Sequence, residues 1–256
     1  RFKNALTFVN GQYWGIYETR ERIDADYTEY YYNQSQKWVD MLAYWGGLTI
    51  DEGSDTAWVN LFNYIVANNM AVQSNYNYVI QRLDPMSLID YFVLNTYTVN
   101  SDWLNWNTAW WRGRKTPNNV RWKYRLWDQD NTFDLGENYT GLPTTGNTAD
   151  PCDVQTIPQF SNTNDPEIGH VRIFNKLMQN PTFEQMYINR YSDLINRAFY
   201  CQNMLNHFDT MIARLQPEMQ RHCTRWSASY NTWLQNVTYT RNQIAGRCNN
   251  VVTGLG

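Results

Sequence analysis

The pattern of apolar and polar positions gives the chain a strand-forming start and helical segments after it. The stretch "LTFVNGQYWGIYE" (6–18) has two β-rich runs on either side of Asn10-Gly11. This dipeptide between apolar runs is a strong signal for a hairpin with a type I′ turn. Apolar residues then recur at helical spacing in "QKWVDMLAYW" (36–45) and "TAWVNLFNYIVANNMA" (56–71), so both segments are predicted to be helices, the second capped by Asp55.

The middle of the chain combines a helix with a hairpin. "DPMSLIDYFVLNTYTVN" (84–100) predicts a helix with Asp84 as its N-cap and Pro85 in its first turn. Residues 107–130 then predict two strands, because Gly113 to Asn119 supplies Gly, Pro and paired Asn between two aromatic runs.

The last part of the chain is predicted to be a long loop followed by helices. Residues 134–166 are rich in Gly, Pro, Thr, Asn and Asp and have no periodicity, and a loop of this length is usually functional or mobile. Beyond it the spacing predicts four amphipathic helices that form a bundle. These segments are 170–180, 182–200, 201–222 and 229–248.

Composition describes an ordinary globular protein. With 256 residues the chain can form one domain or two closely packed lobes. A net charge of -3 offers no basic excess for a nucleic-acid backbone, so no nucleic-acid partner is expected. No apolar run is long enough to cross a bilayer and no signal segment opens the chain. Because it begins at Arg1, a processed or trimmed product is expected.

The four cysteines favour disulfides over a metal site. No CxxC pair is present, which argues against zinc and redox motifs. Two disulfides are expected, with three possible pairings: Cys201 and Cys223 are predicted on neighbouring helices, and a Cys152–Cys248 link would tie a loop to the last helix. The alternative is four buried free thiols.

Several weak signals point to secretion. Aromatic residues make up 16% of the chain, and Asn and Thr are frequent. Three N-x-[ST] sequons begin at Asn33, Asn138 and Asn236 and are compatible with glycosylation. We therefore expect a secreted or surface protein.

Short oxygen-bearing side chains inside aromatic surroundings mark a candidate site. "VNSDWLNWNTAWWRG" (99–113) contains Asp102 and Asn107, and after the predicted hairpin "RLWDQDNTFD" contains Asp128 and Asp130. Mg²⁺ prefers carboxylate and amide oxygens, and a separate carboxylate can accept the proton of an attacking hydroxyl. An Asp with an Asn five residues on, followed by a metal-binding Asp after the next hairpin, is the kinase arrangement. The alternative is a capping Asp and a turn Asn.

The other reactive side chains are better explained by packing or solvation. The tryptophans of this stretch could stack on a base or a sugar, but we predict that they pack in the core. These are Trp103, Trp106, Trp110 and Trp111. The histidines lack metal-ligand spacing and are expected on helix surfaces or in packing. They are His170, His207 and His222. Arg112, Arg114 and Lys115 could meet a phosphate, although solvated charges at a turn are favoured.

Five segments resemble the CotH kinase family. They are "VNGQYWGIYETRERID", "LDPMSLIDYFVLNTY", "NSDWLNWNTAWWRG", "RWKYRLWDQDNTFDLG" and "PEMQRH" with Arg225-Trp226. The resemblance runs nearly end to end and implies an α+β, divergent protein-kinase-like fold in a single domain. It implies an N-terminal hairpin region (1–25), a part with helices and the catalytic and metal hairpin (26–133), the long loop (134–166) and C-terminal helices (167–256).

The resemblance also implies roles for particular residues. Asp102 matches the catalytic Asp, and Asn107, Asp128 and Asp130 match metal ligands for Mg²⁺ or Mn²⁺. Trp127 and Glu21 are the candidate residues for binding ATP, Glu21 as the acidic partner of a basic residue. The alternative for Glu21 is a surface residue on a first helical turn.

The family pattern differs from this sequence at one end. Family members carry strands with phosphate-binding basic residues before the segment matching "LTFVNGQYWGIYE", so these strands are expected to come from a preceding segment or another chain, unless this member is shortened. The implied activity is ATP-dependent phosphorylation of a secreted or surface protein. The alternatives are a non-catalytic extracellular coat, adhesive or assembly protein that binds protein or glycan, and, more weakly, a glycosidase using Asp102 and Asp128.

Overall fold

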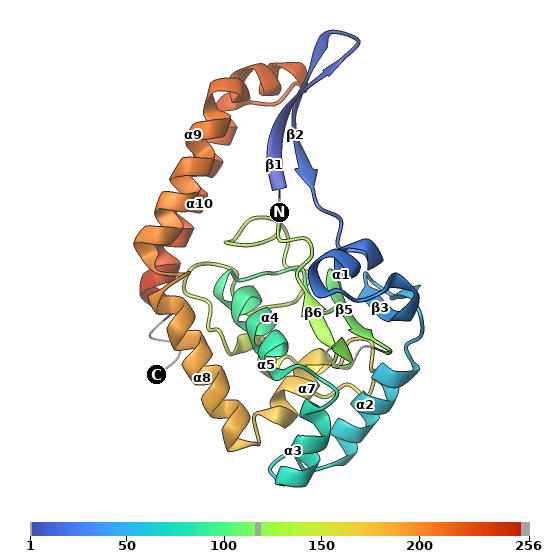
Figure 1. Ribbon diagram of the computed structural model, residues 1–256. Coiled ribbons are helices and arrows are strands. Elements are labelled where there is room, and N and C mark those ends of the chain that lie inside the picture. Colours follow the sequence, from blue (N-terminus) through green and yellow to red (C-terminus); the bar gives the residue numbers. More distant parts are fainter. Residues whose placement is uncertain (1, 116–118, 252–256) are drawn as a thin grey trace.

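The fold is a mixture of strands and helices (Figure 1). The structure, a computed structural model, describes residues 2–115 and 119–251. Within these ranges a two-stranded hairpin stands apart from a four-stranded antiparallel sheet, and helices surround that sheet. The expected α+β class is confirmed.

The strands form the predicted hairpins and one strand pair that was not predicted. Their bounds are β1 Phe2–Val9, β2 Gln12–Arg20, β3 Val39–Tyr44, β4 Leu48–Glu52, β5 Thr108–Gly113 and β6 Lys123–Arg125. β1 and β2 pair around Asn10 (φ 49°) and Gly11 (φ 75°), two left-handed residues in succession, as a type I′ turn requires. β5 pairs antiparallel with β6, which confirms the second predicted hairpin. Of its predicted turn, residues 116–118 lie outside the described part.

The prediction of a helix over 36–45 is wrong. Gln36–Trp38 forms a short 3-10 helix (η1), and β3 follows it in a sheet of order β4-β3-β5-β6. All residues of β3 from Val39 to Ala43 are buried. A strand covered on both faces has an unbroken buried run, and a short apolar run of this kind cannot be told from a helix by its periodicity.

Two of the helices predicted before the long loop are present, together with two short helices that were not predicted. Bounds from the start of the chain are α1 Ala25–Tyr32, α2 Thr56–Ala67, α3 Gln73–Ile80, α4 Pro85–Tyr97, α5 Asp153–Thr156 and α6 Pro158–Ser161. α2 and α4 confirm the helices expected over 56–71 and 84–100, and Asp84 caps α4 by accepting a hydrogen bond from the backbone N–H of Ser87. Asp55 directly precedes α2 as expected, but its side chain makes no capping hydrogen bond. The segment predicted as loop, 134–166, contains the one-turn helices α5 and α6.

The four predicted C-terminal helices are present, but they do not pack together as one bundle. They are α7 His170–Leu177, α8 Pro181–Asn196, α9 Cys201–Arg225 and α10 Tyr230–Asn250. α7 packs against α2, α5 and α6, and α8 packs against α4, whereas α9 and α10 pack chiefly against each other along one flank (Figure 1). Amphipathic spacing shows that one face of a helix packs against another part of the protein, but it does not show which part.

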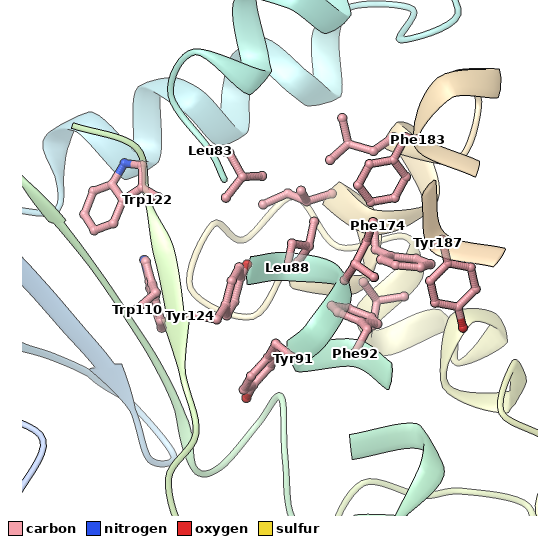
Figure 2. Packing of buried hydrophobic residues seen from close by; sticks show 14 of the residues in the cluster. Leu83, Leu88, Tyr91, Phe92, Trp110, Trp122, Tyr124, Phe174, Phe183 and Tyr187 are labelled. Atoms are coloured by element: carbon pink, nitrogen blue, oxygen red, sulfur yellow. The ribbon is translucent and has the colours of Figure 1, made fainter. Parts of the chain in front are cut away.

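The core is aromatic and lies between the four-stranded sheet, α2, α4 and the helices α7 and α8 (Figure 2). The Trp58 ring centroid lies 5.3 Å from that of Trp110 and 5.4 Å from the buried His170 ring. Trp103, Trp110 and Trp111 are buried, so packing is confirmed for these three residues. Burial lowers the pKa of His170 to about 3, which keeps its ring neutral while Tyr124 hydrogen-bonds its Nδ1 at 2.8 Å.

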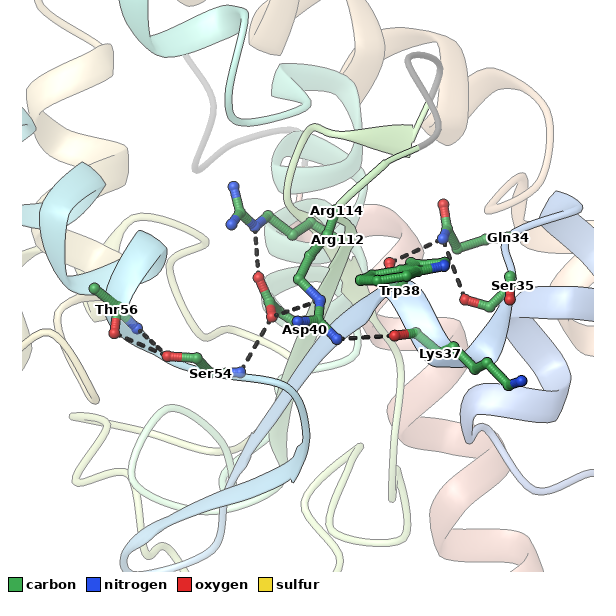
Figure 3. Close-up of polar contacts among 9 residues, drawn as sticks. All are labelled: Gln34, Ser35, Lys37, Trp38, Asp40, Ser54, Thr56, Arg112 and Arg114. Carbon is green, nitrogen blue, oxygen red and sulfur yellow. Dashed lines mark hydrogen bonds and ion pairs between the residues drawn. The ribbon is translucent and has the colours of Figure 1, made fainter.

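Arg112 in β5 and Arg114 just after it form ion pairs with one buried carboxylate. Asp40 on β3 is buried and receives the Arg112 Nε at 2.8 Å and the Arg114 Nε at 3.5 Å (Figure 3). Its carboxylate also accepts the backbone N–H of Ser54. The expectation of a solvated charge is therefore wrong for Arg112, because a buried carboxylate needs a paired cation and hydrogen bonds. Arg114 is exposed as expected, although it pairs with the same carboxylate.

The N-terminal hairpin is anchored on the turn between α9 and α10. The backbone N–H of Ile16 donates to Nδ1 of His222 at 3.0 Å, and the rings of Trp14 and Trp226 meet edge-on at 5.6 Å. A side chain at Gly15, whose φ is 139°, would come within 2.9 Å of the Trp226 ring. This close approach requires glycine and fixes how β2 crosses the molecule.

The predicted arrangement of the cysteines is wrong. All four cysteines are free thiols in the structure. Cys201 and Cys223 lie on the same helix, α9, rather than on neighbouring helices. They are about 33 Å apart along its axis, since a helix rises about 1.5 Å per residue. A disulfide between them is therefore excluded.

Candidate functional site

Two loops meet beyond the end of α4. We call residues 98–107, which connect α4 to β5, the Asp102 loop, and residues 126–137, which follow β6, the Asp128 loop. The backbone N–H of Ser101 donates to the carbonyl of Asn131 at 3.0 Å, and that of Phe133 donates to the carbonyl of Thr98 at 2.8 Å. These bonds hold the loops side by side although their sequences lie about thirty residues apart.

Buried amide side chains fix both loops to the last turn of α4. Asn100 donates from Nδ2 to Oδ1 of Asn95 at 2.8 Å, and its own Oδ1 accepts the backbone N–H of Asp102 at 2.9 Å. Gln129 of the Asp128 loop donates to the same Asn95 oxygen at 3.3 Å. These hydrogen bonds between amide side chains hold both loops against the end of α4.

Asn107 positions the carboxylate of Asp102. Its Nδ2 donates to Oδ2 of Asp102 at 2.9 Å and to the Asp102 carbonyl at 3.2 Å. Because both Asp102 atoms are acceptors, the amide nitrogen must face Asp102 and the amide oxygen must face away. That oxygen, Oδ1 of Asn107, is buried and has no hydrogen-bond partner in the structure. A buried oxygen without a donor is costly and calls for an explanation.

Three carboxylates repel one another at this place. Burial raises the pKa of Asp102, with further contributions from Asp130 and Asp128 that the Asn107 hydrogen bond opposes. Burial and the adjacent Asp130 also raise the pKa of Asp128, which Arg20 counteracts. Asp102 and Asp128 therefore hold a proton more tightly than they would in water, and a cation at this position would relieve the repulsion.

The backbone of both loops contains unfavourable conformations. Val99 (φ 51°), Leu104 (φ 71°) and Phe133 (φ 56°) are left-handed although their side chains disfavour that region, and Asn107 (φ 51°) and Asp128 (φ 45°) also adopt it. Such residues each cost free energy and cluster at functional sites, where the surrounding structure must impose them.

Four of the six predicted site residues lie together, and the other two are exposed to solvent. Asp102 and Asn107 are in direct contact, and Asp128 and Asp130 are close enough to Asp102 to affect its protonation. Trp127, 42% exposed, directly precedes Asp128 at the solvent edge. Glu21 is exposed in the segment between β2 and α1, so its placement on a helical turn is wrong, and it accepts a hydrogen bond from the Tyr31 hydroxyl at 2.7 Å.

Sequence reasoning missed Arg20 and the buried amides. Arg20 ends β2, forms an ion pair with Glu18 at 2.8 Å, and lies near enough to Asp128 and Asp130 to interact with both charges. The sequence did offer one signal for Arg20, because this residue directly precedes the candidate Glu21 near the end of a predicted strand. Asn100 and Gln129 gave no comparable signal, because an Asn or Gln near a turn is ordinary.

The oxygen atoms present suit a divalent cation of the Mg²⁺ type. Two carboxylates and an amide oxygen without a donor are hard ligands of the kind this ion prefers, and it usually keeps several waters as well. Among the described residues, no group of three or more His, Cys, Asp or Glu side chains is close enough to hold a metal unaided. The fit therefore depends on Asn107 and on oxygens that a phosphate ligand would bring.

Comparison with known proteins agrees with the pattern of motifs. The family model described as CotH kinase protein matches residues 1–251, nearly the whole chain. A search of curated proteins gives no match. In the described part of the chain, no helix is both long and apolar enough to span a membrane. The extent of the family match shows that the chain belongs to the CotH kinase family.

Proposed function

We propose that this chain binds ATP with Mg²⁺ or Mn²⁺ and transfers the γ-phosphoryl group to hydroxyl groups of a protein. The observation that carries the proposal is the unpartnered, buried Oδ1 of Asn107, held beside Asp102 and close to the Asp128 loop. Family membership supports the reaction class. A kinase-like arrangement of the domain belongs to the same proposal.

Asp102 is proposed to be the base. Its raised pKa increases its affinity for a proton, while its position beside Asn107 fixes the carboxylate. In the transfer, the acceptor oxygen forms a bond to the γ-phosphorus, the bond from that phosphorus to the leaving oxygen of ADP breaks, and the hydroxyl proton passes to Asp102. Positioning and charge neutralisation supply most of the catalysis in this reaction class.

Asn107, Asp128 and Asp130 are proposed to hold the cation. Asn107 would offer Oδ1, and the two carboxylates would offer oxygens whose mutual repulsion a cation relieves. A bound Mg²⁺ or Mn²⁺ neutralises phosphate charge and orients the transferred group.

Three further side chains are proposed to bind the nucleotide. The exposed ring of Trp127 offers a flat apolar face for a base. Arg20 offers a guanidinium beside Asp128 and Asp130, where phosphates would lie. Glu21 follows Arg20 and would act as the acidic partner of a basic residue brought by additional strands.

The substrate and surroundings are proposed to be extracellular. The sequon residues Asn33, Asn138 and Asn236 are all exposed, as glycosylation requires. A secreted or surface protein would be the phosphate acceptor, and a preceding segment or chain would add strands to β1. No nucleic acid is proposed as a partner, because the net charge is -3.

Transfer of labelled phosphate from ATP tests the proposal. The purified chain is incubated with Mg²⁺ or Mn²⁺ and a generic acceptor protein such as casein, alongside D102N and D128N variants. We expect metal-dependent labelling that falls by roughly a thousandfold in either variant, since each removes a group that acts in the transition state.

The matched control for these variants is D193N. Asp193 is an exposed carboxylate on α8, so this variant should label the acceptor like the parent chain. Labelling that persists in D128N would refute the site assignment. An absence of labelling with both metals would refute the activity.

A second candidate is a non-catalytic extracellular coat, adhesive or assembly protein. The observation in its favour is the apolar surface of the N-terminal hairpin, where Leu6, Phe8, Val9 and Tyr17 are between 42% and 53% exposed. Surfaces of this kind mark binding sites for other molecules. This candidate predicts that ATP with metal leaves the melting temperature unchanged, whereas a functional nucleotide site predicts a rise.

A further inference from the structure

The long helices α9 and α10 bring two cysteines together. α9 begins at Cys201, and Cys248 lies in the last turn of α10. Because the two helices are joined by a short turn and pack against each other, the start of one lies beside the end of the other (Figure 1). Sγ of Cys201 lies 3.9 Å from the carbonyl of Ala245, one turn before Cys248, and the two thiols are close enough to influence each other's protonation.

We propose that Cys201 and Cys248 form an intrachain disulfide in an oxidising environment and thereby close the open end of the α9–α10 pair. This inference goes beyond the proposed phosphoryl transfer and does not depend on it. The link joins residues 47 positions apart in the sequence, and a cross-link over such a loop removes many conformations from the unfolded chain.

The other two cysteines are placed differently from this pair. Cys223 is buried near the opposite end of α9 from Cys201. Cys152 lies at the start of α5, and the groups that influence its thiol are the carboxylates of Asp150 and Asp153 rather than another cysteine. Of the possible pairings, the structure therefore favours the one between Cys201 and Cys248.

The oxidation balances with a small-molecule disulfide as oxidant. One cysteine thiolate attacks oxidised glutathione, forms a mixed disulfide and releases one glutathione thiolate. The second cysteine thiolate attacks the protein sulfur of that mixed disulfide and releases the other, so that two protein thiols are oxidised and one glutathione disulfide is reduced. The two protons of the cysteines pass to the released glutathiones or to the buffer.

The rate of disulfide formation should depend on pH. Burial, with the neighbouring Cys248 thiol, raises the pKa of Cys201 to about 11. Little Cys201 thiolate is present near neutral pH, so oxidation should become faster as the pH rises.

The cross-link would also hold the end of α4. Arg247, next to Cys248, is fully buried and donates to the carbonyls of Thr96 and Tyr97 at the end of α4, each at 2.8 Å. The Tyr97 hydroxyl lies 3.6 Å from Sγ of Cys248. Fixing Cys248 therefore restrains the position from which the Asp102 loop starts.

Peptide mapping tests the proposal. The full chain is equilibrated with oxidised and reduced glutathione at mildly alkaline pH, remaining thiols are alkylated, and the protein is digested with trypsin without reduction. We expect the peptide of residues 198–214 to be linked to the peptide that starts at Cys248, with Cys152 and Cys223 alkylated. Reductant should then lower the melting temperature by several degrees.

Two variants keep the test decisive. C201S should lose the linked peptide and the effect of reductant on melting, whereas C223S should keep both. Recovery of 198–214 alkylated and unlinked after equilibration would overturn the proposal. So would its linkage to a peptide containing Cys152 or Cys223.

Discussion

The aromatic core and the paired Asp102 and Asp128 loops are built on opposite principles. In the core, the rings of Trp58, Trp110 and His170 are buried against one another, and His170 stays neutral. In the two loops, one of which ends only a few residues before Trp110, carboxylates repel one another, an amide oxygen lacks a donor and the backbone takes unfavourable conformations.

This difference separates the core, which stabilises the fold, from the two loops, whose cost in free energy the rest of the fold must offset. Burial of large rings lowers the free energy of the folded state, whereas repulsion and backbone strain raise it. A chain keeps such costly loops at a place where binding or reaction uses them. Changes in the core should therefore reduce stability, and changes in the loops should reduce function without reducing stability.

The largest effect is expected in the core. W110A removes a fully buried ring and should lower the free energy of unfolding by about 3–5 kcal/mol. Denaturant titration measures the change. W45A removes a ring that is 65% exposed and serves as the control, with an expected change of about 0.5 kcal/mol or less. Equal losses from the two substitutions would contradict the described core.

The next effect is expected at Arg247, which links α10 to α4. R247M leaves the carbonyls of Thr96, Tyr97 and Ala149 without their donor and should cost about 3 kcal/mol of stability. R241M, which removes a solvent-exposed ion pair with Asp209, is the control and should change stability little. Chemical denaturation measures the stability of both variants. An R247M chain as stable as the parent would show that the hydrogen bonds of Arg247 contribute little to stability.

A smaller effect is expected at Arg20. R20A should weaken nucleotide binding roughly three- to tenfold, because it removes one exposed phosphate contact. R22A, whose side chain is 89% exposed, and E18Q, which leaves the guanidinium in place, are the controls. Titration of each variant with ATP and Mn²⁺ gives the comparison. Unchanged affinity in R20A, or an equal loss in R22A, would remove Arg20 from the site.

The smallest effect is a gain in stability when a site carboxylate is neutralised. Since the folded state raises the pKa of Asp102 and Asp128, it binds protons more tightly than the unfolded state, so both charges destabilise the fold above these pKa values. D102N and D128N should raise the melting temperature slightly near neutral pH. The gain should disappear in acid, as the pH falls through the folded pKa values. A lower melting temperature near neutral pH would contradict the repulsion.

Much of this fold followed from local pattern. Asn10-Gly11 predicted the first hairpin, and Asp84 with Pro85 predicted the start of α4, because each signal acts through its own backbone. β3 was mistaken for a helix since burial on both sides erased its period. Partners distant in sequence, such as Asp40 with Arg112 or Cys201 with Cys248, left no local signal and needed the structure.

The candidate site was predictable in part for the same reason. The spacing of Asp102 and Asn107 and the position of Asp128 after a hairpin placed three residues that the structure brings near one another. Arg20 and the amides Asn100 and Gln129 were not foreseen, since their roles depend on how β2 and the two loops approach.

Calorimetric titration of the chain with ADP, with and without Mn²⁺, tests the central claim that these loops form a metal–nucleotide site. The account predicts that the parent chain binds ADP only with the metal, and that D128N loses this binding while melting at the same temperature or slightly higher. Binding without metal, or equal binding by D128N and the parent chain, would contradict it.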